Sequence, residues 1–260
     1  MRKQKERNSI VIIVAYVVLG IFSFMCIAPV VLMAVASFTD NDVLNLYGYT
    51  YFPQKWSLEA YEFLIKQGTV ISKSFLNSIL VTFMGTALGI MVTVLLAYTI
   101  SRKELVGRKL IMLFVFFTML FNGGMVPTYL MYTQIFHIKN TMWALLFPHL
   151  LVNGFNVLLV RTFFNENIPE VLLEAARIDG AGEISIFRNV VLPISKPILA
   201  TIGLLVGVGY WNDWYNGLLF VTDVNYYTLQ NFLNKIRRYT NEKKNYWIAN
   251  GNVPGSNAVH

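Results

Sequence analysis

Long apolar stretches alternate with short polar segments along most of the chain. A helix that crosses the hydrocarbon layer of a bilayer needs about 20 mostly apolar residues. The pattern predicts five such spans, at residues 10–38, 75–100, 110–136, 141–160 and 197–221. Two spans contain interruptions: Asn122, Gly123, Gly124 and Pro127 in the third, and Pro148, His149 and Gly154 in the fourth. We therefore expect an all-α integral membrane protein with about five spans.

A shorter amphipathic pattern lies in the loop between the first two spans, residues 39–74. Within WSLEAYEFLIKQ (residues 56–67), Leu58, Tyr61 and Leu64 recur at helical spacing on one face. Ser57 precedes them and is a suitable N-cap. This pattern predicts a short helix that lies along the membrane surface.

Composition supports the membrane assignment. The 260 residues are 55% hydrophobic and 13% charged, whereas soluble domains are usually about 25% charged. The net charge of +7 does not indicate nucleic acid binding, because the basic residues cluster beside apolar runs. Cys26 is the one cysteine and cannot form an internal disulfide.

The basic clusters predict the orientation, because short cytoplasmic loops are enriched in lysine and arginine. One cluster precedes the first span and another separates the second from the third: Arg2, Lys3, Lys5 and Arg7, then Arg102, Lys103, Arg108 and Lys109. Residues 1–9 are thus expected in the cytoplasm and the segment after residue 221 outside. A third cluster at residues 235–244 opposes this assignment. The uncharged run after the first cluster, residues 8–39, is longer than the core of a signal peptide and favours a retained span.

The most polar internal stretch is EAARIDGAGEISIFRNVVLP, residues 174–193. Asn167 and Pro169 predict the start of a helix that ends near Ile178, and Asp179-Gly180 predicts a turn. A second short helix follows from about Glu183, with apolar residues at helical spacing. In the first helix Glu170 and Glu174 repel each other, and Arg177 can pair with Glu174. These residues alone leave two interpretations open, a solvated loop or a partner-binding surface.

This stretch resembles the signature loop of bacterial ABC importer permeases. More closely, the chain is similar to permeases of the carbohydrate-uptake group, of the type of the maltose system's smaller membrane subunit. Further matching motifs occur in the family's order: WSLEAY (56–61), FLNSI (75–79), AYTISR (97–102), Gly107-Arg108-Lys109 and WND (211–213). The resemblance extends from about Trp56 to Asn231 and implies the type I importer bundle.

The resemblance also implies that residues 166–193 form two coupling helices that insert into a cytoplasmic ATP-binding subunit. The residues that it assigns to this contact are Glu174, Ala175, Ala176, Asp179, Gly180, Leu192 and Pro193. The family usually has Ser or Thr where this chain has Gly182, which puts only the start of the second helix in question. The implied partners are a second permease, an ATPase dimer, an extracellular solute-binding protein and the lipid bilayer of a bacterial plasma membrane.

One larger departure concerns the end of the chain. Family members have a sixth span, but nothing from Asp223 onward is apolar enough to cross a membrane. We expect residues 10–222 to form the transmembrane domain and residues 223–260 an extracytoplasmic tail, truncated before that span.

No residue pattern indicates catalysis. The chain has no G-x-x-x-x-G-K-[ST] phosphate loop, no zinc-ligand spacing and no nucleophile–base constellation. We therefore expect no catalytic residue, no metal site and no bound cofactor, with ATP and Mg²⁺ held by the partner ATPase.

Polar side chains at membrane depth are candidates for a transport path, because they are costly against lipid. These candidates are Asn122, His149, Asn153, Asn156, Trp211, Asn212, Asp213 and Trp214. Amides and carboxylates bind sugar hydroxyls, and indole rings offer flat faces to sugar rings. The alternative is that the tryptophans belong to the interfacial aromatic belt, that Asp213 lies at the water boundary and that His149 bonds a neighbouring helix.

The leading hypothesis is a permease subunit for an oligosaccharide, a cargo that rests on the family resemblance. A related permease for an amino acid, phosphate or polyamine is one alternative. A self-sufficient membrane channel or enzyme is another, and it would leave the polar stretch at residues 174–193 without a purpose.

Overall fold

The computed structural model describes the backbone of residues 2–148 and 151–249, and this part of the chain is helical without a named strand. The all-α expectation is confirmed. In chain order the elements are α1 (Arg2–Ser37), α2 (Asn41–Tyr47), α3 (Glu59–Lys66), α4 (Gly68–Ser101), α5 (Arg108–Leu120), α6 (Met125–Leu130), η1 (Met131–Ile135), α7 (Trp143–Leu146), α8 (Gly154–Asn167), α9 (Glu170–Ile178), α10 (Glu183–Ile186), η2 (Phe187–Val191), α11 (Leu192–Ile194), α12 (Lys196–Trp211), α13 (Tyr215–Phe220), η3 (Val224–Tyr226) and α14 (Leu229–Ala249).

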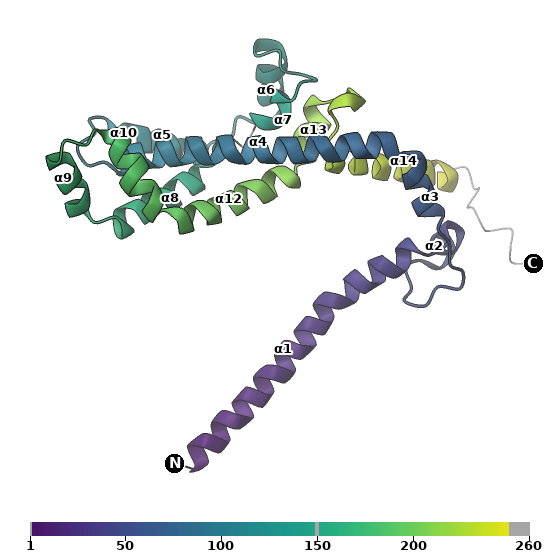
Figure 1. Ribbon diagram of the computed structural model, residues 1–260. Helices are drawn as coiled ribbons and strands as arrows, with labels where there is room; N and C mark the ends of the chain where they lie inside the picture. The colour runs from purple at the N-terminus through teal and green to yellow at the C-terminus, as the bar shows by residue number, and fades with distance from the viewer. Residues whose placement is uncertain (1, 149–150, 250–260) are drawn as a thin grey trace, which may run out of the picture. The chain divides into compact units, whose positions relative to one another are not determined.

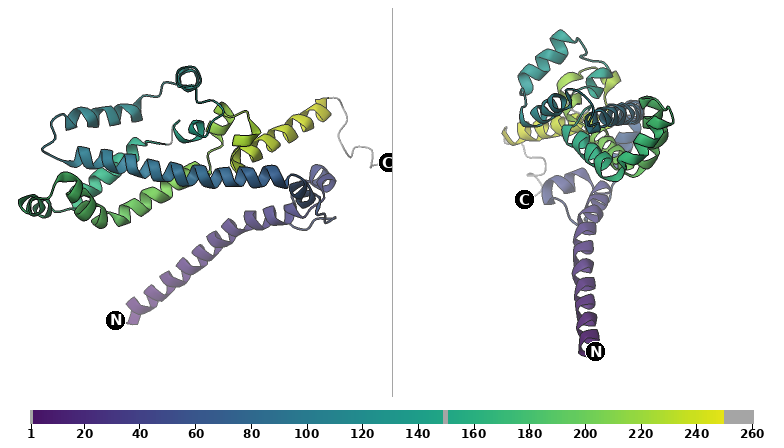
Figure 2. Two further views of the ribbon diagram at one scale, coloured as in Figure 1. Left: turned by 45° about the horizontal axis from the view of Figure 1, so that its top comes forward. Right: turned by 90° about the vertical axis from the view of Figure 1, so that its left-hand side faces the viewer.

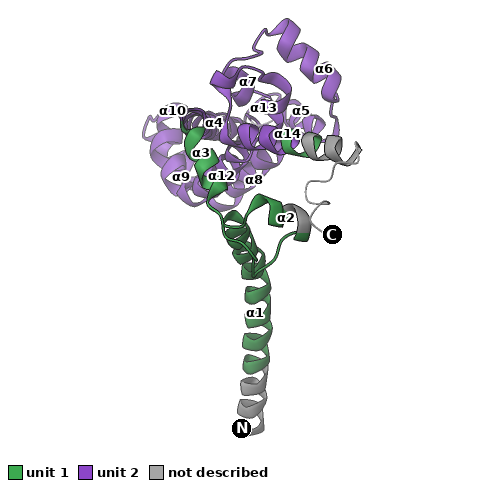
Figure 3. Ribbon diagram, turned by 90° about the vertical axis from the view of Figure 1, so that its right-hand side faces the viewer, with its two compact units in different colours: residues 1–68, 239–260 green, residues 69–238 purple. Residues whose placement is uncertain are grey.

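The chain divides into two compact units (Figure 3), residues 1–68 with 239–260, and residues 69–238. In the first unit, α1 carries a span at Ile12–Ser37 whose side chains are not buried by the protein. A helix that is apolar on every side is suited to lipid. Next to it, Tyr51 donates to the carbonyl of Ala28, and Ser37 lies 2.9 Å from the hydroxyl of Tyr61.

The predicted short helix of the loop is present as α3, with one correction, and its position along the membrane surface stays a prediction. Leu58 rather than Ser57 is at the N-cap position. The hydroxyl of Ser57 still accepts a hydrogen bond from the backbone N–H of Glu59 at 3.1 Å. Ser57 therefore satisfies one of the free N–H groups at the helix start, although it lies one residue before the N-cap.

In the second unit, α4 is the long central helix, and α9 and α10 lie at its C-terminal end while the start of α14 lies toward its N-terminal end (Figures 1 and 2). α12 runs beside α4 through small residues. Gly85 and Gly89 of α4 meet Tyr210 and Val206 of α12. Gly203 and Gly207 of α12 in turn meet Ile90 and Thr86. Glycines spaced four residues apart allow the two helix backbones to approach closely. The resulting van der Waals contacts stabilise the pair in lipid, where the hydrophobic effect does not drive helices together.

The predicted spans are only partly confirmed. Two helices, at Ile12–Ser37 and Gly68–Ser101, are long and apolar enough to cross a membrane, and two bent helix pairs raise the number to four in the described residues. The third predicted span is one of these pairs, since α5 and the following helix (Met125–Ile135) meet at 114° across the Gly123-Gly124 break. The fifth predicted span, residues 197–221, is only partly correct, because α12 ends at Trp211 and the separate helix α13 begins at Tyr215. α12 also meets the preceding helical segment Glu183–Ile194 at 80°.

The fourth predicted span, residues 141–160, is wrong as a continuous helix. The chain forms α7, leaves the helix near Pro148 and starts α8 at Gly154. Proline cannot donate to the helical ladder, and Asn153 begins a new helix by accepting from Phe155 and Asn156. Tyr210 donates to the carbonyl of Leu146 at 2.7 Å and Asn216 to that of Pro148 at 2.9 Å, so two carbonyls at the end of α7 have partners inside the protein, as membrane depth requires.

The FLNSI motif holds the segment that follows α13. Asn77 donates to the carbonyls of Asn225 and Tyr227 at 2.9 and 3.0 Å. Ser78 accepts from the N–H of Leu229, the first residue of α14. Two buried polar side chains of α4 thus replace water for three backbone groups. α14 is a helix that the sequence analysis did not predict, and it is too polar to count as a span.

The close contact of Gly85 with Tyr210 gives a test of this packing. A Cβ at Gly85 would lie 2.5 Å from Cζ of Tyr210, which itself is fixed by its bond to Leu146. We expect Gly85→Val to lower the thermal midpoint of the purified protein in detergent, because overpacking typically costs about 1–3 kcal/mol. Ala87→Val, at an exposed position of the same helix, is the control. Equal midpoints for the two variants would contradict the packing.

Candidate functional site

The candidate site is the polar loop of residues 166–193, whose first helix is α9. The predicted end at Ile178 is confirmed, but the predicted start needs a correction. Pro169 is at the N-cap position, and the side chain of Asn167 instead donates to the carbonyl of Phe163 within α8. An asparagine in the last turn of one helix is bound there and cannot also cap the next.

The predicted turn at Asp179-Gly180 is present. The N–H groups of Asp179, Gly180 and Ala181 donate to the carbonyls of Ala175, Arg177 and Ala176, which closes the helix end. Gly180 has a φ of +82°, and nothing lies within 4 Å of where its Cβ would be. Glycine is therefore needed here for its backbone conformation and not for space.

The second helical piece begins at Glu183 as predicted, with Gly182 as its N-cap. It continues as α10, η2 and α11, so that Leu192 and Pro193 lie at the joint with α12. Ser195 is fully buried at this joint, and its hydroxyl donates to the carbonyl of Val191 at 2.6 Å. This buried bond closes the end of the segment Glu183–Ile194 at the 80° bend.

An apolar stripe is exposed on α9. Val171 and Ile178 are 75% and 87% exposed, and the small exposed side chain of Ala175 lies between them on the same face. Glu174 is exposed beside this stripe and Ala176 is half-buried. Ile184 of α10 is 84% exposed. Large exposed apolar side chains that gather on one element mark an interaction surface.

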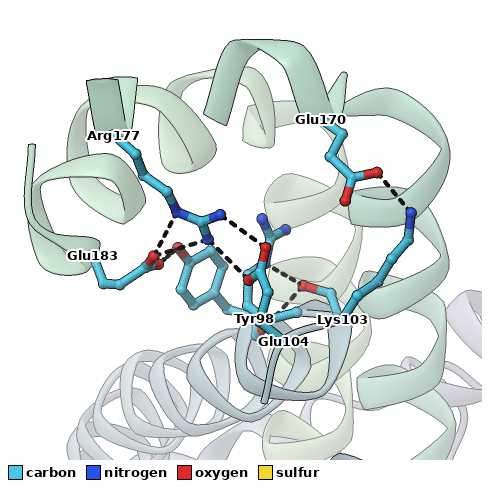
Figure 4. A network of polar contacts seen from close by, with 8 residues as sticks. Tyr98, Lys103, Glu104, Glu170, Arg177 and Glu183 are labelled. Carbon is cyan, nitrogen blue, oxygen red and sulfur yellow. Dashed lines mark hydrogen bonds and ion pairs between the residues drawn. The ribbon is translucent and has the colours of Figure 1, made fainter. Parts of the chain in front are cut away.

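The opposite face of α9 is tied to the rest of the second unit by Arg177 (Figure 4). Its Nη1 and Nη2 donate to the two carboxylate oxygens of Glu104 at 2.9 and 3.1 Å, and its Nε donates to Glu183 at 3.0 Å. The predicted pair with Glu174 is wrong. Two-pronged arginine–carboxylate bonds are among the strongest ion pairs, and this geometry favours Glu104, which lies after α4, over a neighbour on the same helix.

Tyr98 completes this cluster from the end of α4. Its hydroxyl donates to Glu183 at 2.7 Å, and its ring lies 4.9 Å from that of Phe187 in η2. The guanidinium of Arg102 lies 4.7 Å from the centre of the same ring. A further ion pair of 2.6 Å joins Lys103 to Glu170 at the start of α9. We call Tyr98, Glu104, Arg177 and Glu183 the arginine clamp.

The electrostatics of the clamp are those of a formed ion pair. The hydrogen bonds from Arg177 hold the pKa of Glu104 below its ordinary value, with the nearby positive charges acting in the same direction. Glu104, which would be ionised at neutral pH in any case, therefore stays ionised to lower pH in the clamp than a free glutamate does. Sequence reasoning missed Glu104 and Glu183 as partners of Arg177, and Tyr98 as a partner of Glu183. Glu104 and Tyr98 are 73 and 85 residues from their partners in the chain, and Glu183 lies across the turn at Gly180, so helical spacing relates none of these pairs.

The structure places the candidate path residues in separate settings. Asn153 caps α8, and Asp213 accepts from the N–H groups of Tyr215 and Asn216 at the start of α13. Asn122 accepts from Gly124 in the break after α5, and Asn212 donates to Val208 at the end of α12. Asn156 is buried, Trp211 packs edge-on against Phe75, and Trp214 packs edge-on against Tyr215. His149 lies outside the described residues.

These residues do not form one described site, and their role in transport stays a prediction. Asn122 borders a hollow of about 470 Å³ together with Thr118, Thr128 and Tyr132.

Comparison with known proteins places the chain in a family. Residues 85–236 match the family described as "Binding-protein-dependent transport system inner membrane component". The polygalacturonan/rhamnogalacturonan transport system permease protein YtcP of Bacillus subtilis (strain 168) is 36% identical over 230 residues, which are 88% of this chain and 79% of YtcP. The trehalose/maltose transport system permease protein MalG of Thermococcus litoralis is 30% identical over 226 residues, 86% of this chain and 79% of MalG.

A solved structure agrees. It is a bacterial ABC transporter involved in the import of the acidic polysaccharide alginate, with a TM-score of 0.76 and 29% identity over 86% of this chain and 78% of that chain. The chain therefore belongs to the binding-protein-dependent transport system inner membrane components. It is a membrane-embedded, multi-pass permease with the fold of a type I ABC importer, and the resemblance to the carbohydrate-uptake group is confirmed.

The clamp predicts coupling between Glu104 and Arg177. Glu104→Gln and Arg177→Met should each increase hydrogen exchange in residues 170–180, and the double variant should exceed Arg177→Met only slightly. The coupling free energy should be at the upper end for exposed pairs, about 0.5–1 kcal/mol. Glu166→Gln, an exposed carboxylate in no ion pair of the described residues, is the control. Additive effects of the two single changes would contradict the pair.

The clamp also predicts a pH dependence. Because the pKa of Glu104 is lowered by folding, its stabilising contribution is complete above the ordinary carboxylate pKa of about 4.3 and is lost as pH falls through the lowered value. We expect the protein to protect α9 from exchange more than Glu104→Gln does at pH 7, and the difference to shrink progressively as the pH falls below about 4.3. A difference that does not change below that pH, after correction for intrinsic exchange, would show that ionised Glu104 is not its cause.

Proposed function

We propose that the chain is the permease subunit of an ATP-driven importer for oligosaccharides, and that α9 and α10 form its contact with an ATP-binding subunit. The cargo proposal is supported by relatives that are named for the transport of polygalacturonan and rhamnogalacturonan, and of trehalose and maltose. Acidic oligosaccharides come first in a test panel, since the similar solved transporter imports an acidic polysaccharide.

The exposed stripe of α9 is the observation that carries the coupling proposal. Val171, Ala175 and Ile178 present apolar surface at one end of the second unit, next to the carboxylate of Glu174. Exposure of isoleucine and valine to water does not stabilise the loop. A partner that covers these side chains makes the free energy of binding more favourable by about 25 cal/mol per Å² of apolar area buried. The small Ala175 and Ala176 allow a partner backbone to approach closely.

The arginine clamp supplies the mechanical connection. When the ATP-binding subunit moves α9 and α10, the bonds of Arg177 and Tyr98 to Glu104 and Glu183 transmit that movement to the end of α4. The bend at Ser195 transmits it to α12. Both helices meet through the Gly85 and Gly89 contact, so they move as packed rods between inward- and outward-facing arrangements.

The partners and orientation follow from this proposal. The N-terminus and residues 166–193 lie in the cytoplasm, where the ATP-binding subunits hold ATP and Mg²⁺ and perform all catalysis. A second permease completes the translocation path. An extracytoplasmic solute-binding protein delivers the sugar to the side that carries residues 39–74. The basic residues 102–109 beside the clamp agree with a cytoplasmic position for this end.

A docking experiment tests the coupling proposal. Ile178→Asp should reduce co-purification of the ATP-binding subunit by at least tenfold, because the loss of one buried isoleucine contact is worth about 1.5–3 kcal/mol. Val106→Asp is a matched control, since Val106 is 96% exposed and belongs to the loop after α4. Unchanged recovery with Ile178→Asp, or an equal loss with Val106→Asp, would contradict α9 as the docking element.

A further inference from the structure

A second feature of the same end of the bundle is a polar hollow of about 580 Å³ behind α9. Its lining comes from the loop between α4 and α5 and from the facing parts of α8 and α9. Three half-buried arginines contribute to it, Arg102, Arg108 and Arg161. We propose that this hollow binds the phosphate of an anionic phospholipid headgroup.

The charges of the hollow favour an anion. Its other charged side chains are largely paired with each other, Lys103 with Glu170 and Arg177 with Glu104. Glu166 also borders it, as an acidic side chain outside these pairs. None of the three arginines takes part in an ion pair within the described part of the chain. Three cations against one carboxylate leave an excess of positive charge that an incoming phosphate would compensate.

The arginines are held so that donors remain for a ligand. Arg161 uses Nε to bond the carbonyl of Ile100 at 3.4 Å, and Arg102 uses Nε to bond Ser101 at 3.1 Å. The two Nη groups of each appear in no described bond and can donate to phosphate oxygens, for which the planar guanidinium is well suited. Arg108 begins α5, whose N-terminus has no side-chain cap and carries a partial positive charge.

The position of the hollow favours a lipid over a soluble phosphate. It lies where α4 ends at Ser101 and α5 begins at Arg108, and both helices belong to candidate spans or bent spans. The end of a span is the depth of the headgroup layer. Phe164, Ile168 and Leu173 also border the hollow, but they are buried in the core. Basic pockets between spanning helices on the cytoplasmic side characteristically bind such headgroups.

The hollow is separate from the exposed apolar stripe. It is lined by Glu170, Leu173 and Arg177 of α9, which recur at helical spacing on the face that turns toward the bundle. Val171, Ala175 and Ile178 occupy another face of the same helix. A bound headgroup therefore leaves the docking face free. The cytoplasmic position of the hollow rests on the proposed function, but lipid binding is measured without the ATP-binding subunit, so its failure and the failure of docking are distinguishable.

Native mass spectrometry of the full-length protein in detergent tests this proposal. We expect added dioleoyl phosphatidylglycerol to form a one-to-one adduct at lower concentration than dioleoyl phosphatidylcholine does. Arg108→Gln should weaken the phosphatidylglycerol adduct roughly tenfold, as the loss of one charge-assisted bond implies, and Arg108→Gln with Arg161→Gln should abolish it. Lys109→Gln, an exposed neighbour that does not line the hollow, should leave it unchanged.

The outcomes separate the alternatives. Equal binding of phosphatidylcholine, or an equal loss with Lys109→Gln, would overturn the proposal, because the attraction would then not involve the hollow. Binding of inorganic phosphate without binding of phosphatidylglycerol would overturn the assignment to a lipid. Because Arg161 also bonds the backbone of α4, the thermal midpoint of each variant is measured too. Arg108→Gln, which breaks no described side-chain bond, decides the result if the double variant is unstable.

Discussion

The bonds of Arg177 to Glu104 and Glu183 are the interaction on which the rest of the account depends. α9 is nine residues long, and a helix of that length is marginal in water without packing. It buries only Leu173 fully. Its orientation is therefore set by charge-assisted bonds to the end of α4, and these bonds leave its apolar stripe turned outward. A loop that is both fixed on one side and exposed on the other can receive force from a partner and pass it on.

The bundle behind this loop shows how a membrane protein keeps its packing stiff without a hydrophobic driving force between helices. Gly85 and Gly89 bring α4 against α12, and Tyr210 fills the resulting contact while donating to the carbonyl of the last residue of α7. Asn77 and Ser78 then hold the start of α14 by backbone bonds. Close packing at small residues and hydrogen bonds from buried polar side chains together stabilise this bundle, as hydrophobic burial stabilises the core of a soluble protein.

The sequence predicted those parts that depend on local pattern. The long apolar runs gave α1 and α4, the Asp179-Gly180 pair gave the turn with positive φ, and Asn122-Gly123-Gly124 gave the break after α5. It did not predict that residues 141–160 form parts of two helices. The whole stretch is apolar, and apolar composition does not show that the helix ends near Pro148 and begins again after Asn153. Nor did it find the partners of Arg177, since Glu104 is 73 residues away in sequence. The sequence motif indicated α9, but only the structure shows that its exposed apolar stripe and the arginine clamp lie on different faces of the helix.

The central claim is that α9 and α10 move with the end of α4 as one body. The most direct measurement is the distance between spin labels at Ser185 of α10 and Leu95 of α4, both exposed positions, in the assembled transporter without nucleotide and with ATP trapped. A narrow distribution with the same mean in both states is the predicted result, together with a shift between either label and the second permease. A change of several ångströms between Ser185 and Leu95 would contradict the account, because the loop would then move independently of the helix that it is supposed to drive.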